Sequence, residues 1–473
     1  MSIPELLAAT DPALIAVVDG DVTLTYGELR NAARRVGATF GGGERVAIWA
    51  PNCWQWIVAV LGIWEAGATL VPINTRFKGA EAEVILQRSG ASTLLTVRDF
   101  LGVDYASMVD APGLRVIDLD GLPEAEPVDV KVTDDDVSDI LFTSGTTGVP
   151  KGVVMTHGRT LTVARDWVAM TGLRAGDRYL MVNPYFHMFG LKAGILACVA
   201  AGATMYPEAV FDAGRALQRV QDARITVFPG APTLYESLLD HPDRDTYDLS
   251  SLRVAVTGAA DIPVTLIERV RTELPFELVV TGYGLTEAGT VSATSADDDA
   301  TTVATTVGRA RPGYEMRIDG HEPVGEVLVR SATVMREYLD DPEATAAAID
   351  ADGWLHTGDL GTIGDDGCLR IVGRSKDMFI VGGFNAYPAE IENLLLRHAG
   401  VAQAAVIGVP DERLGEVGMA FVVGDVDPDE LVAWAKENMA NYKVPRRVEV
   451  VAALPVNATG KVVKDELRAM VTR

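Results

Sequence analysis

The sequence predicts an α/β protein in which helices cover mostly parallel sheets, followed by a small α+β unit. Two observations predict this fold class. Strand and helix signals alternate as far as Gly282, which is typical of parallel sheets covered by helices. Near Arg374 the pattern changes to closely spaced strands with fewer helices. The chain of 473 residues is long enough for two to three domains, at roughly 150 residues per domain.

The first alternation opens with a helix whose start is marked by a capping box. Thr25 is the expected N-cap and Glu28 follows three residues later, so a helix is expected to run to about Phe40. A buried strand, a helix and a second strand are expected next, at residues 45–50, 54–67 and 69–73.

The alternation resumes in the middle of the chain. The expected helices lie at about 212–224, 232–240 and 263–273, and the expected strands at 225–228, 252–258 and 277–282. The Pro- and Asp-rich segment 121–139 is expected to be a surface loop. The apolar run 193–205 is too short to span a bilayer and predicts a buried helix that runs into a strand.

The C-terminal unit has the size of a small domain, roughly 100 residues. Expected strands at 377–383, 402–409, 419–423 and 446–451 alternate with two helices. The first helix covers 388–398. The second begins after Asp427, the expected N-cap, with Pro428 at its first position.

Composition excludes several classes of protein. The net charge of −25 argues against a nucleic-acid partner. Cys53, Cys198 and Cys368 lie far apart and form no C-x-x-C pair, which argues against a disulfide framework or a zinc site and favours a reducing cytoplasm. The N-terminus has no basic region and carries Glu5 and Asp11, unlike a secretory signal.

The stretch "LFTSGTTGVPKGVVMTH" (141–157) predicts, taken alone, either a phosphate-binding loop or a plain hairpin. Glycines let backbone N–H groups converge on an anion, and Ser and Thr add hydroxyl donors. It is not a Walker loop, because Pro150 and Gly152 replace the second glycine and the Ser/Thr around Lys151. The residues after Lys151 predict a strand, so the loop is expected to be a hairpin.

Five other stretches carry residues suited to chemistry. They are "PYFHMFG" with His187, "TGYGLTEAG" (281–289) after a strand, "WLHTGDLG" with Asp359 in an expected loop, "GRSKDMFIVGG" with Arg374, and "PVNATGKVVK" with Lys461 on a glycine turn. Taken singly, each has a plainer explanation. His187 alone is more often a core histidine, Asp359 a turn cap, Lys461 a surface lysine and Arg374 an ion-pair partner.

In this order along the chain, these stretches resemble the superfamily of adenylate-forming enzymes: acyl- and aryl-CoA synthetases, peptide-synthetase adenylation domains and beetle luciferases. The resemblance covers essentially the whole chain. It implies an N-terminal ATP- and acyl-binding domain, 1–374, of helix-covered sheets with a small β-barrel-like part. It also implies a mobile α+β lid domain, 375–473, hinged near Lys376.

The resemblance implies a two-step reaction that uses ATP, Mg²⁺ and coenzyme A. A substrate carboxylate attacks the α-phosphate and expels pyrophosphate, and the thiol of coenzyme A then attacks the acyl-adenylate. Because both partners of the first step are anionic, catalysis depends on positioning and charge neutralisation.

By resemblance, the catalytic residues are Lys461, Thr286, Glu287 and His187. Lys461 would bridge the α-phosphate and the carboxylate, Thr286 would contact the α-phosphate, and Glu287 would hold Mg²⁺. Gly383 would leave room for the pantetheine arm of coenzyme A. The implied ATP- or AMP-binding residues are Thr143, Ser144, Gly145, Thr146, Thr147, Gly148, Lys151, Gly258, Ala259, Ala260, Thr281, Gly282, Tyr283 (on adenine), Gly284, and Asp359 and Arg374 (on the ribose).

The resemblance implies an acyl pocket between the His187 segment, residues 256–260 and residues 281–287. By the same resemblance, none of these segments contributes an acidic residue placed to hold an amino acid's ammonium. An acyl-CoA ligase is therefore favoured over a peptide-synthetase domain. Several stretches outside the shared motifs resemble the actinobacterial ligases for the bicyclic indanedione propanoate from steroid rings. Met188 and Leu191 depart from that pattern. Lys192 is either a helix-surface lysine, the favoured interpretation, or a group that reaches a ring ketone.

Three alternatives stay open: a medium- or long-chain fatty acyl-CoA ligase, an acyl-adenylate binder that runs one half-reaction, and a luciferase-type oxygenase. The expected partner is a small carboxylic acid, with no nucleic acid and no membrane span. "PVNATGK" also resembles the Pro-x₄-Gly-Lys signature that lysine acetyltransferases modify, which makes Lys461 a candidate acetylation site.

Overall fold

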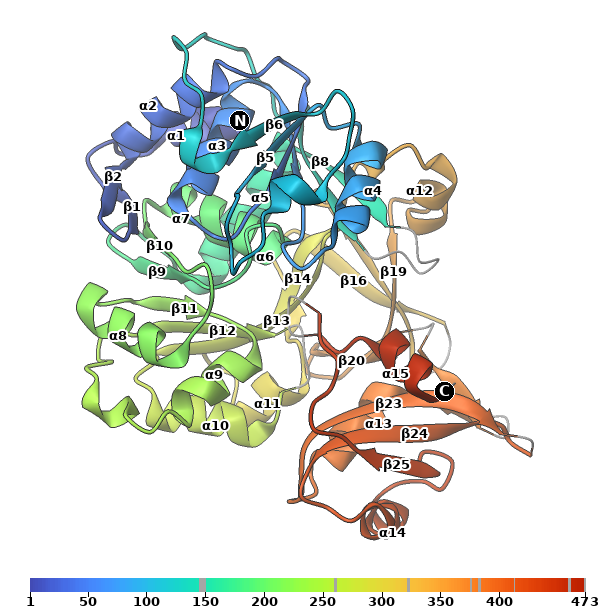
Figure 1. The fold of residues 1–473 in the computed structure, drawn as a ribbon. Helices are drawn as coiled ribbons and strands as arrows, with labels where there is room; N and C mark the ends of the chain where they lie inside the picture. The colour runs from blue at the N-terminus through green and yellow to red at the C-terminus, as the bar shows by residue number, and fades with distance from the viewer. Residues whose placement is uncertain are drawn as a thin grey trace.

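The structure, a computed structural model, describes residues 1–143, 150–258, 262–320, 324–374, 377–381, 384–411, 413–457 and 461–471. A large N-terminal domain is built on two helix-covered sheets, with a smaller antiparallel sheet beside them, and a smaller C-terminal domain lies at the lower right (Figure 1). No helix in the described part of the chain has the length and apolar content needed to cross a bilayer.

The first large sheet has seven strands in the order β18-β8-β7-β4-β3-β5-β6. The strands from β7 to β6 are parallel, whereas β7 and β8 form the expected antiparallel hairpin. The strands are β3 (Arg45–Trp49), β4 (Thr69–Pro72), β5 (Thr93–Thr96), β6 (Arg115–Asp118), β7 (Val137–Thr143), β8 (Lys151–Thr156) and β18 (Glu337–Tyr338).

The second large sheet has nine strands in the order β15-β14-β13-β12-β11-β9-β10-β1-β2. Its centre, from β13 to β1, is parallel, as the alternating pattern predicts. The strands are β1 (Ile15–Asp19), β2 (Val22–Thr25), β9 (Arg178–Met181), β10 (Thr204–Pro207), β11 (Val227–Pro229), β12 (Val254–Gly258), β13 (Leu278–Leu285), β14 (Gly289–Ala293) and β15 (Arg309–Ala310).

One continuous core joins the facing sides of the two large sheets. It contains α3 (Trp54–Glu65), which is buried from Trp56 to Trp64 because both sheets pack against it. Nearly every residue of this helix is apolar, as expected of a helix buried all round. The same core holds residues of α1 (Ile3–Ala9), α2 (Tyr26–Gly37), α5 (His157–Thr171), α6 (Met188–Gly190), the π-helix Leu191–Leu196 and α7 (Ala197–Ala201).

The outer faces of both sheets are also covered. Helices α8 (Ala213–Ala223), α9 (Pro232–Leu239), α10 (Val264–Glu273) and α11 (Ala300–Thr305) pack on the nine-stranded sheet, and α4 (Gly79–Ser89) packs on the seven-stranded sheet. The predicted elements are confirmed to within a few residues, including the capping box of α2. The surface-loop prediction for 121–139 is wrong at its end, because β7 begins at Val137 and Asp139 is fully buried.

A third, antiparallel sheet has the order β16-β17-β19-β20, with β16 (Tyr314–Asp319), β17 (Gly325–Ser331), β19 (Leu355–Ile363) and β20 (Leu369–Arg374). Helix α12 (Pro342–Ala348) precedes β19. Asp359 lies within β19, not in the expected loop. Asp359 pairs with Arg374 of β20, and a bulge between Leu360 and Gly361 lies beside this pair. Both residues are therefore at the end of this sheet.

The C-terminal domain has its own hydrophobic core. Its five strands are β21 (Phe379–Val381), β22 (Phe384–Ala386), β23 (Val401–Asp411), β24 (Gly415–Gly424) and β25 (Arg447–Val450). Its helices are α13 (Pro388–Leu395), α14 (Pro428–Asn438) and α15 (Lys464–Val471). Asp427 caps α14 as predicted, accepting from the backbone N–H groups of Asp429 and Glu430.

Candidate active site

Some of the predicted site residues lie where strands of the N-terminal domain end: Lys151, Glu287, Asp359, Arg374 and Lys461 are linked there by contacts and electrostatic interactions. Thr143, at the end of β7, pairs with Lys151 at the start of β8. Gly258 and Gly282 are neighbours in the parallel register of β12 and β13. Because ligands bind at the carboxyl ends of parallel strands, this edge is the expected position of a nucleotide.

Three side chains from distant segments form one contact chain. The Lys151 ammonium lies 4.9 Å from the centre of the Tyr338 ring, within the range of a cation–π contact. The Tyr338 hydroxyl donates to Glu287 Oε1 at 3.0 Å. Tyr338 is held there by β18, which pairs with Val153 and Val154 of β8.

Glu287 is a desolvated carboxylate. Burial raises its pKa, while the Tyr338 hydrogen bond and Arg374 act in the opposite direction. No group of three or more His, Cys, Asp or Glu side chains in the described residues could hold a metal ion by itself. A single carboxylate fits Mg²⁺ that takes its other ligands from phosphate and water, the usual arrangement at nucleotide sites.

Asp359 forms a second cluster with Tyr283 and Arg374. The Tyr283 hydroxyl donates to Asp359 Oδ2 at 2.6 Å, and Arg374 Nε lies 3.2 Å from Asp359 Oδ1. Asp359 is 8% exposed. Burial raises the pKa of Tyr283, and the Asp359 carboxylate raises it further, so the phenol keeps its proton. The carboxylate is thereby fixed at the site edge with acceptor capacity left over.

Lys461 comes to this edge from the C-terminal domain. Lys461 is an exposed residue, yet partial desolvation by the surrounding protein lowers the pKa of its ammonium. Arg374 lowers it further, whereas Asp359 and Asp377 raise it. The direction of this shift agrees with a partly desolvated cation beside another cation. An anion bound there would reverse the shift.

His187 is an N-cap residue of α6. Its Nδ1 accepts from the Phe189 N–H at 3.2 Å, and burial lowers its pKa to about 4. A neutral imidazole whose Nδ1 accepts carries its proton on Nε2, so His187 presents a donor. Met188 and Leu191, from the same segment, are buried in the main core.

Lys192 is not the surface lysine that the sequence favoured. It is fully buried in the π-helix Leu191–Leu196, with Nζ 2.9 Å from Asp139 Oδ1. Asp139 Oδ2 accepts from the hydroxyls of Ser138 and Thr160 at 2.6 and 2.8 Å. π-Helical turns are rare and often mark functional segments.

Two of the residues that make these contacts were missed by the sequence analysis. Tyr338 contacts Glu287 because β18 pairs with β8, and no local sequence motif predicts that pairing. Asp139 was assigned to a surface loop because of its acidic neighbours. The short apolar run 140–142 directly after Asp139 was the available signal for a buried strand.

Several predicted site residues lie outside the described residues. These are Ser144, Gly145, Thr146, Thr147, Gly148, Ala259, Ala260, Lys376 and Gly383. Of the others, Thr281 donates its N–H to Thr294 Oγ1, Gly284 is an exposed residue of β13, and Thr286 is half-buried in the turn between β13 and β14.

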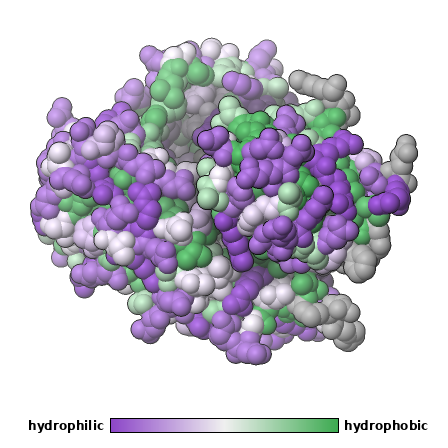
Figure 2. Space-filling view, turned by 90° about the horizontal axis from the view of Figure 1, so that it is seen from below, coloured by the Kyte–Doolittle hydropathy of each residue, from purple (hydrophilic) through white to green (hydrophobic). Residues whose placement is uncertain are grey.

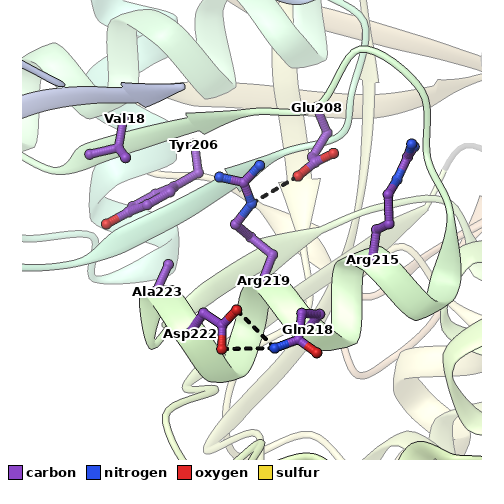
Figure 3. Close-up of a pocket in the computed structure, with 8 residues that line it drawn as sticks. All are labelled: Val18, Tyr206, Glu208, Arg215, Gln218, Arg219, Asp222 and Ala223. Carbon is purple, nitrogen blue, oxygen red and sulfur yellow. Dashed lines mark hydrogen bonds and ion pairs between the residues drawn. The ribbon is translucent and has the colours of Figure 1, made fainter. Parts of the chain in front are cut away.

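A cavity of about 560 Å³ lies elsewhere, between α8 and strands β1 and β10 of the nine-stranded sheet (Figure 3). Two pairs of its polar side chains contact each other: Arg219 Nε lies 3.2 Å from Glu208 Oε1, and Gln218 donates to Asp222. None of the predicted site residues lines it. Seen from below, the molecule is mostly hydrophilic and has a hollow between its left and right parts (Figure 2).

The family model for the AMP-binding enzyme matches residues 5–339, and the model for its C-terminal domain matches residues 390–461. The chain is 50% identical to the 3-[(3aS,4S,7aS)-7a-methyl-1,5-dioxo-octahydro-1H-inden-4-yl]propanoyl:CoA ligase of Rhodococcus jostii, over 96% of this chain and 95% of the relative. It is also 50% identical to the ligase of the same name from Mycobacterium tuberculosis, over 97% and 96%.

Solved structures agree with these relatives. ATP-bound MatB from Rhodopseudomonas palustris superposes with a TM-score of 0.88 at 28% identity, covering 99% of both chains. The O-succinylbenzoate coenzyme A synthetase of Bacillus subtilis, in complex with ATP and a magnesium ion, gives 0.87 at 31% identity, covering 99% of both chains. The chain therefore belongs to the AMP-binding enzyme family, among relatives that are CoA ligases.

Proposed function

We propose that this protein is an AMP-forming acyl-CoA ligase that activates a bulky cyclic carboxylic acid with ATP and transfers the acyl group to coenzyme A. The observation that carries the proposal is the convergence of Lys151, Glu287, Asp359, Arg374 and Lys461 at one edge. These residues come from both domains, and each has the chemistry that one part of ATP or the acid requires.

In the first step a carboxylate oxygen forms a bond to the α-phosphorus as the bond to pyrophosphate breaks. Lys151, with the hairpin that contains Ser144 to Gly148, would hold the outer phosphates. Asp359 would accept from the ribose hydroxyls, with Arg374 beside it, and Tyr283 would lie against adenine. Lys461 would neutralise the charge shared by the α-phosphate and the carboxylate. Such donors act strongly in a site that is fixed before the reaction.

Glu287 and the phosphates would hold Mg²⁺, which would neutralise negative charge on the phosphates as pyrophosphate leaves. Tyr338 supports this assignment, because its hydrogen bond fixes the orientation of the Glu287 carboxylate. Thr286 would add a hydroxyl donor to the α-phosphate. Gly258, Ala259, Ala260, Thr281, Gly282 and Gly284 would provide backbone around the nucleotide.

In the second step the thiol sulfur forms a bond to the acyl carbon and AMP leaves. The domain boundary at 374/375 and a hinge at Lys376 would let the C-terminal domain turn between the steps and bring Gly383 to the pantetheine arm. Arg374, half exposed at the end of β20, is the last described residue before that hinge.

The substrate class rests on the two relatives at 50% identity, which are ligases for a bicyclic propanoate. His187, through Nε2–H, would orient the acid. Met188 and Leu191 are buried and apolar, and apolar side chains at these positions would suit a bulky apolar acid. The alternative is a linear fatty acid, because a long-chain fatty acid–CoA ligase of Mycobacterium tuberculosis is 35% identical over 98% of this chain.

A panel of carboxylic acids tests the substrate class through CoA-dependent AMP release. The bicyclic propanoate should exceed a linear acid of similar carbon count by roughly tenfold in kcat/KM, about 1.4 kcal/mol in transition-state binding. Equal or better turnover of decanoate would favour the fatty-acid alternative. No AMP release with any acid of the panel would contradict the ligase assignment itself.

Lys461→Ala separates the two half-reactions. Adenylate formation should fall by about 10²- to 10³-fold, because a charge-stabilising donor is lost. Conversion of supplied acyl-adenylate to the thioester should continue. Acetylation of Lys461 by a lysine acetyltransferase removes the same charge and should have the same effect, reversed by deacetylation. An equal fall in both half-reactions would show that Lys461 has only a structural role.

A further inference from the structure

The loop between β4 and α4, residues 73–78, contacts the C-terminal domain next to Lys461. Arg76 Nη1 donates to the backbone carbonyl oxygen of Asn457 at 2.9 Å. The two residues are 381 positions apart in the chain. The contact therefore joins the N-terminal domain to the segment that carries the candidate catalytic lysine.

Asn457 and Lys461 belong to one hairpin, which we call the lysine hairpin (residues 455–457 and 461–463). The Asn457 N–H donates to the Lys461 carbonyl at 2.8 Å, and the Lys461 N–H donates to Asn457 Oδ1 at 2.9 Å. Val456 and Val462 form an antiparallel bridge beside them. Because the two residues are hydrogen-bonded both ways, a group that fixes Asn457 also fixes the backbone of Lys461.

Arg76 extends from a loop that is rigidly supported. The indole N–H of Trp49 donates to the Asn74 carbonyl at 2.9 Å, and the Tyr105 hydroxyl donates to the Thr75 carbonyl at 2.8 Å. Both aromatic residues are buried, and their rings stack with centroids 4.5 Å apart. The Arg76 N–H is itself fixed by Asn74 Oδ1 at 2.9 Å. The backbone at Arg76 is thus held in place by residues of the core of the seven-stranded sheet.

We propose that Arg76 is a positioning residue for adenylate formation, which holds the lysine hairpin so that Lys461 faces the site edge. The proposal rests on the proposed function, because it acts through Lys461. Arg76 is exposed, so ordering its long side chain opposes the contact through lost rotamer freedom. The hydrogen bond from a charged donor offsets that loss.

The contact between Arg76 and Asn457 should matter in only one of the two half-reactions. It belongs to the arrangement in which Lys461 lies within electrostatic reach of Asp359 and Arg374. When the C-terminal domain turns for thioester formation, the hairpin leaves this edge and the Arg76 contact must break. Arg76 therefore favours the first arrangement only, and its loss should slow the first half-reaction alone.

The test compares Arg76→Ala with Arg76→Lys and with Lys78→Ala in the full-length protein. Lys78 is an exposed cation two residues along the same loop. Its backbone N–H donates to Glu81, and among the described residues it makes no hydrogen bond or ion pair with the C-terminal domain. Adenylate formation should slow by about five- to tenfold in Arg76→Ala, the effect of one charged hydrogen bond near the surface. Arg76→Lys should recover part of the rate, and Lys78→Ala should match the wild type.

A second measurement is independent of activity. Hydrogen exchange at the amides of Lys461 and Val463 should be faster in Arg76→Ala than in the wild type, and unchanged in Lys78→Ala. Unchanged exchange in Arg76→Ala would overturn the contact, and an equal fall in both half-reactions would overturn the positioning role. If the wild-type protein forms no adenylate, the proposed function fails, while faster exchange would still establish the contact.

Discussion

The buried ion pair between Lys192 and Asp139 allows a quantitative test of the structure. Both side chains are 0% exposed, and Nζ lies 2.9 Å from Oδ1. Lys192→Met removes the ammonium and leaves a carboxylate in the core, with only the Ser138 and Thr160 hydroxyls on its other oxygen. Uncompensated buried charges of this kind destabilise a protein by about 3–5 kcal/mol.

Asp139→Asn should have a similar effect, because it leaves the ammonium without its partner. The double variant, Lys192→Met with Asp139→Asn, replaces the pair by neutral groups of similar shape and leaves no charge behind. It should lie within about 1–2 kcal/mol of the wild type, since replacing a whole buried pair is often nearly neutral. The coupling energy between the two sites should therefore be several kcal/mol, well above the error of such measurements.

Urea unfolding followed by tryptophan fluorescence measures these differences. Trp49, Trp56 and Trp64 are all fully buried in the N-terminal domain and report its unfolding. Single variants that each lose less than about 1 kcal/mol, with additive effects in the double variant, would refute the reasoning. Such a result would mean that Lys192 and Asp139 do not form a charged pair in the core.

Two other predictions concern the site and the pH dependence of stability. Tyr338→Phe keeps the ring beside Lys151 but removes the donor to Glu287, so the affinity for Mg²⁺ in the presence of ATP, measured by calorimetry, should fall about tenfold; an unchanged affinity would contradict the orienting role. Burial lowers the pKa of His157 from 6.5 to about 4 in the folded state. Below pH 6.5 the unfolded state therefore binds more protons, and the free energy of unfolding decreases as the pH is lowered from about 6.5 to about 4. Between pH 7 and pH 5 this should remove about 2 kcal/mol, a loss that His157→Gln should not show in parallel urea titrations. Equal losses in both proteins would assign the effect to other groups.

The sequence by itself determined the elements and their class. The capping box at Thr25, the N-cap at Asp427 and the alternation of strand and helix signals depend on neighbours in the chain, so they could be predicted locally. The motifs at Lys151, Glu287, Asp359 and Lys461 indicated the chemistry only together, through their resemblance to a known family, because each motif alone has a plainer explanation.

Only the tertiary structure decided which side chains meet. Tyr338 contacts Glu287 because β18 pairs with β8, and Arg76 reaches Asn457 because two domains pack together. Lys192, expected on a surface, is buried because Asp139 from a distant strand supplies its countercharge. A cation can lie in the core only if such a partner exists, and periodicity along one segment carries no information about it.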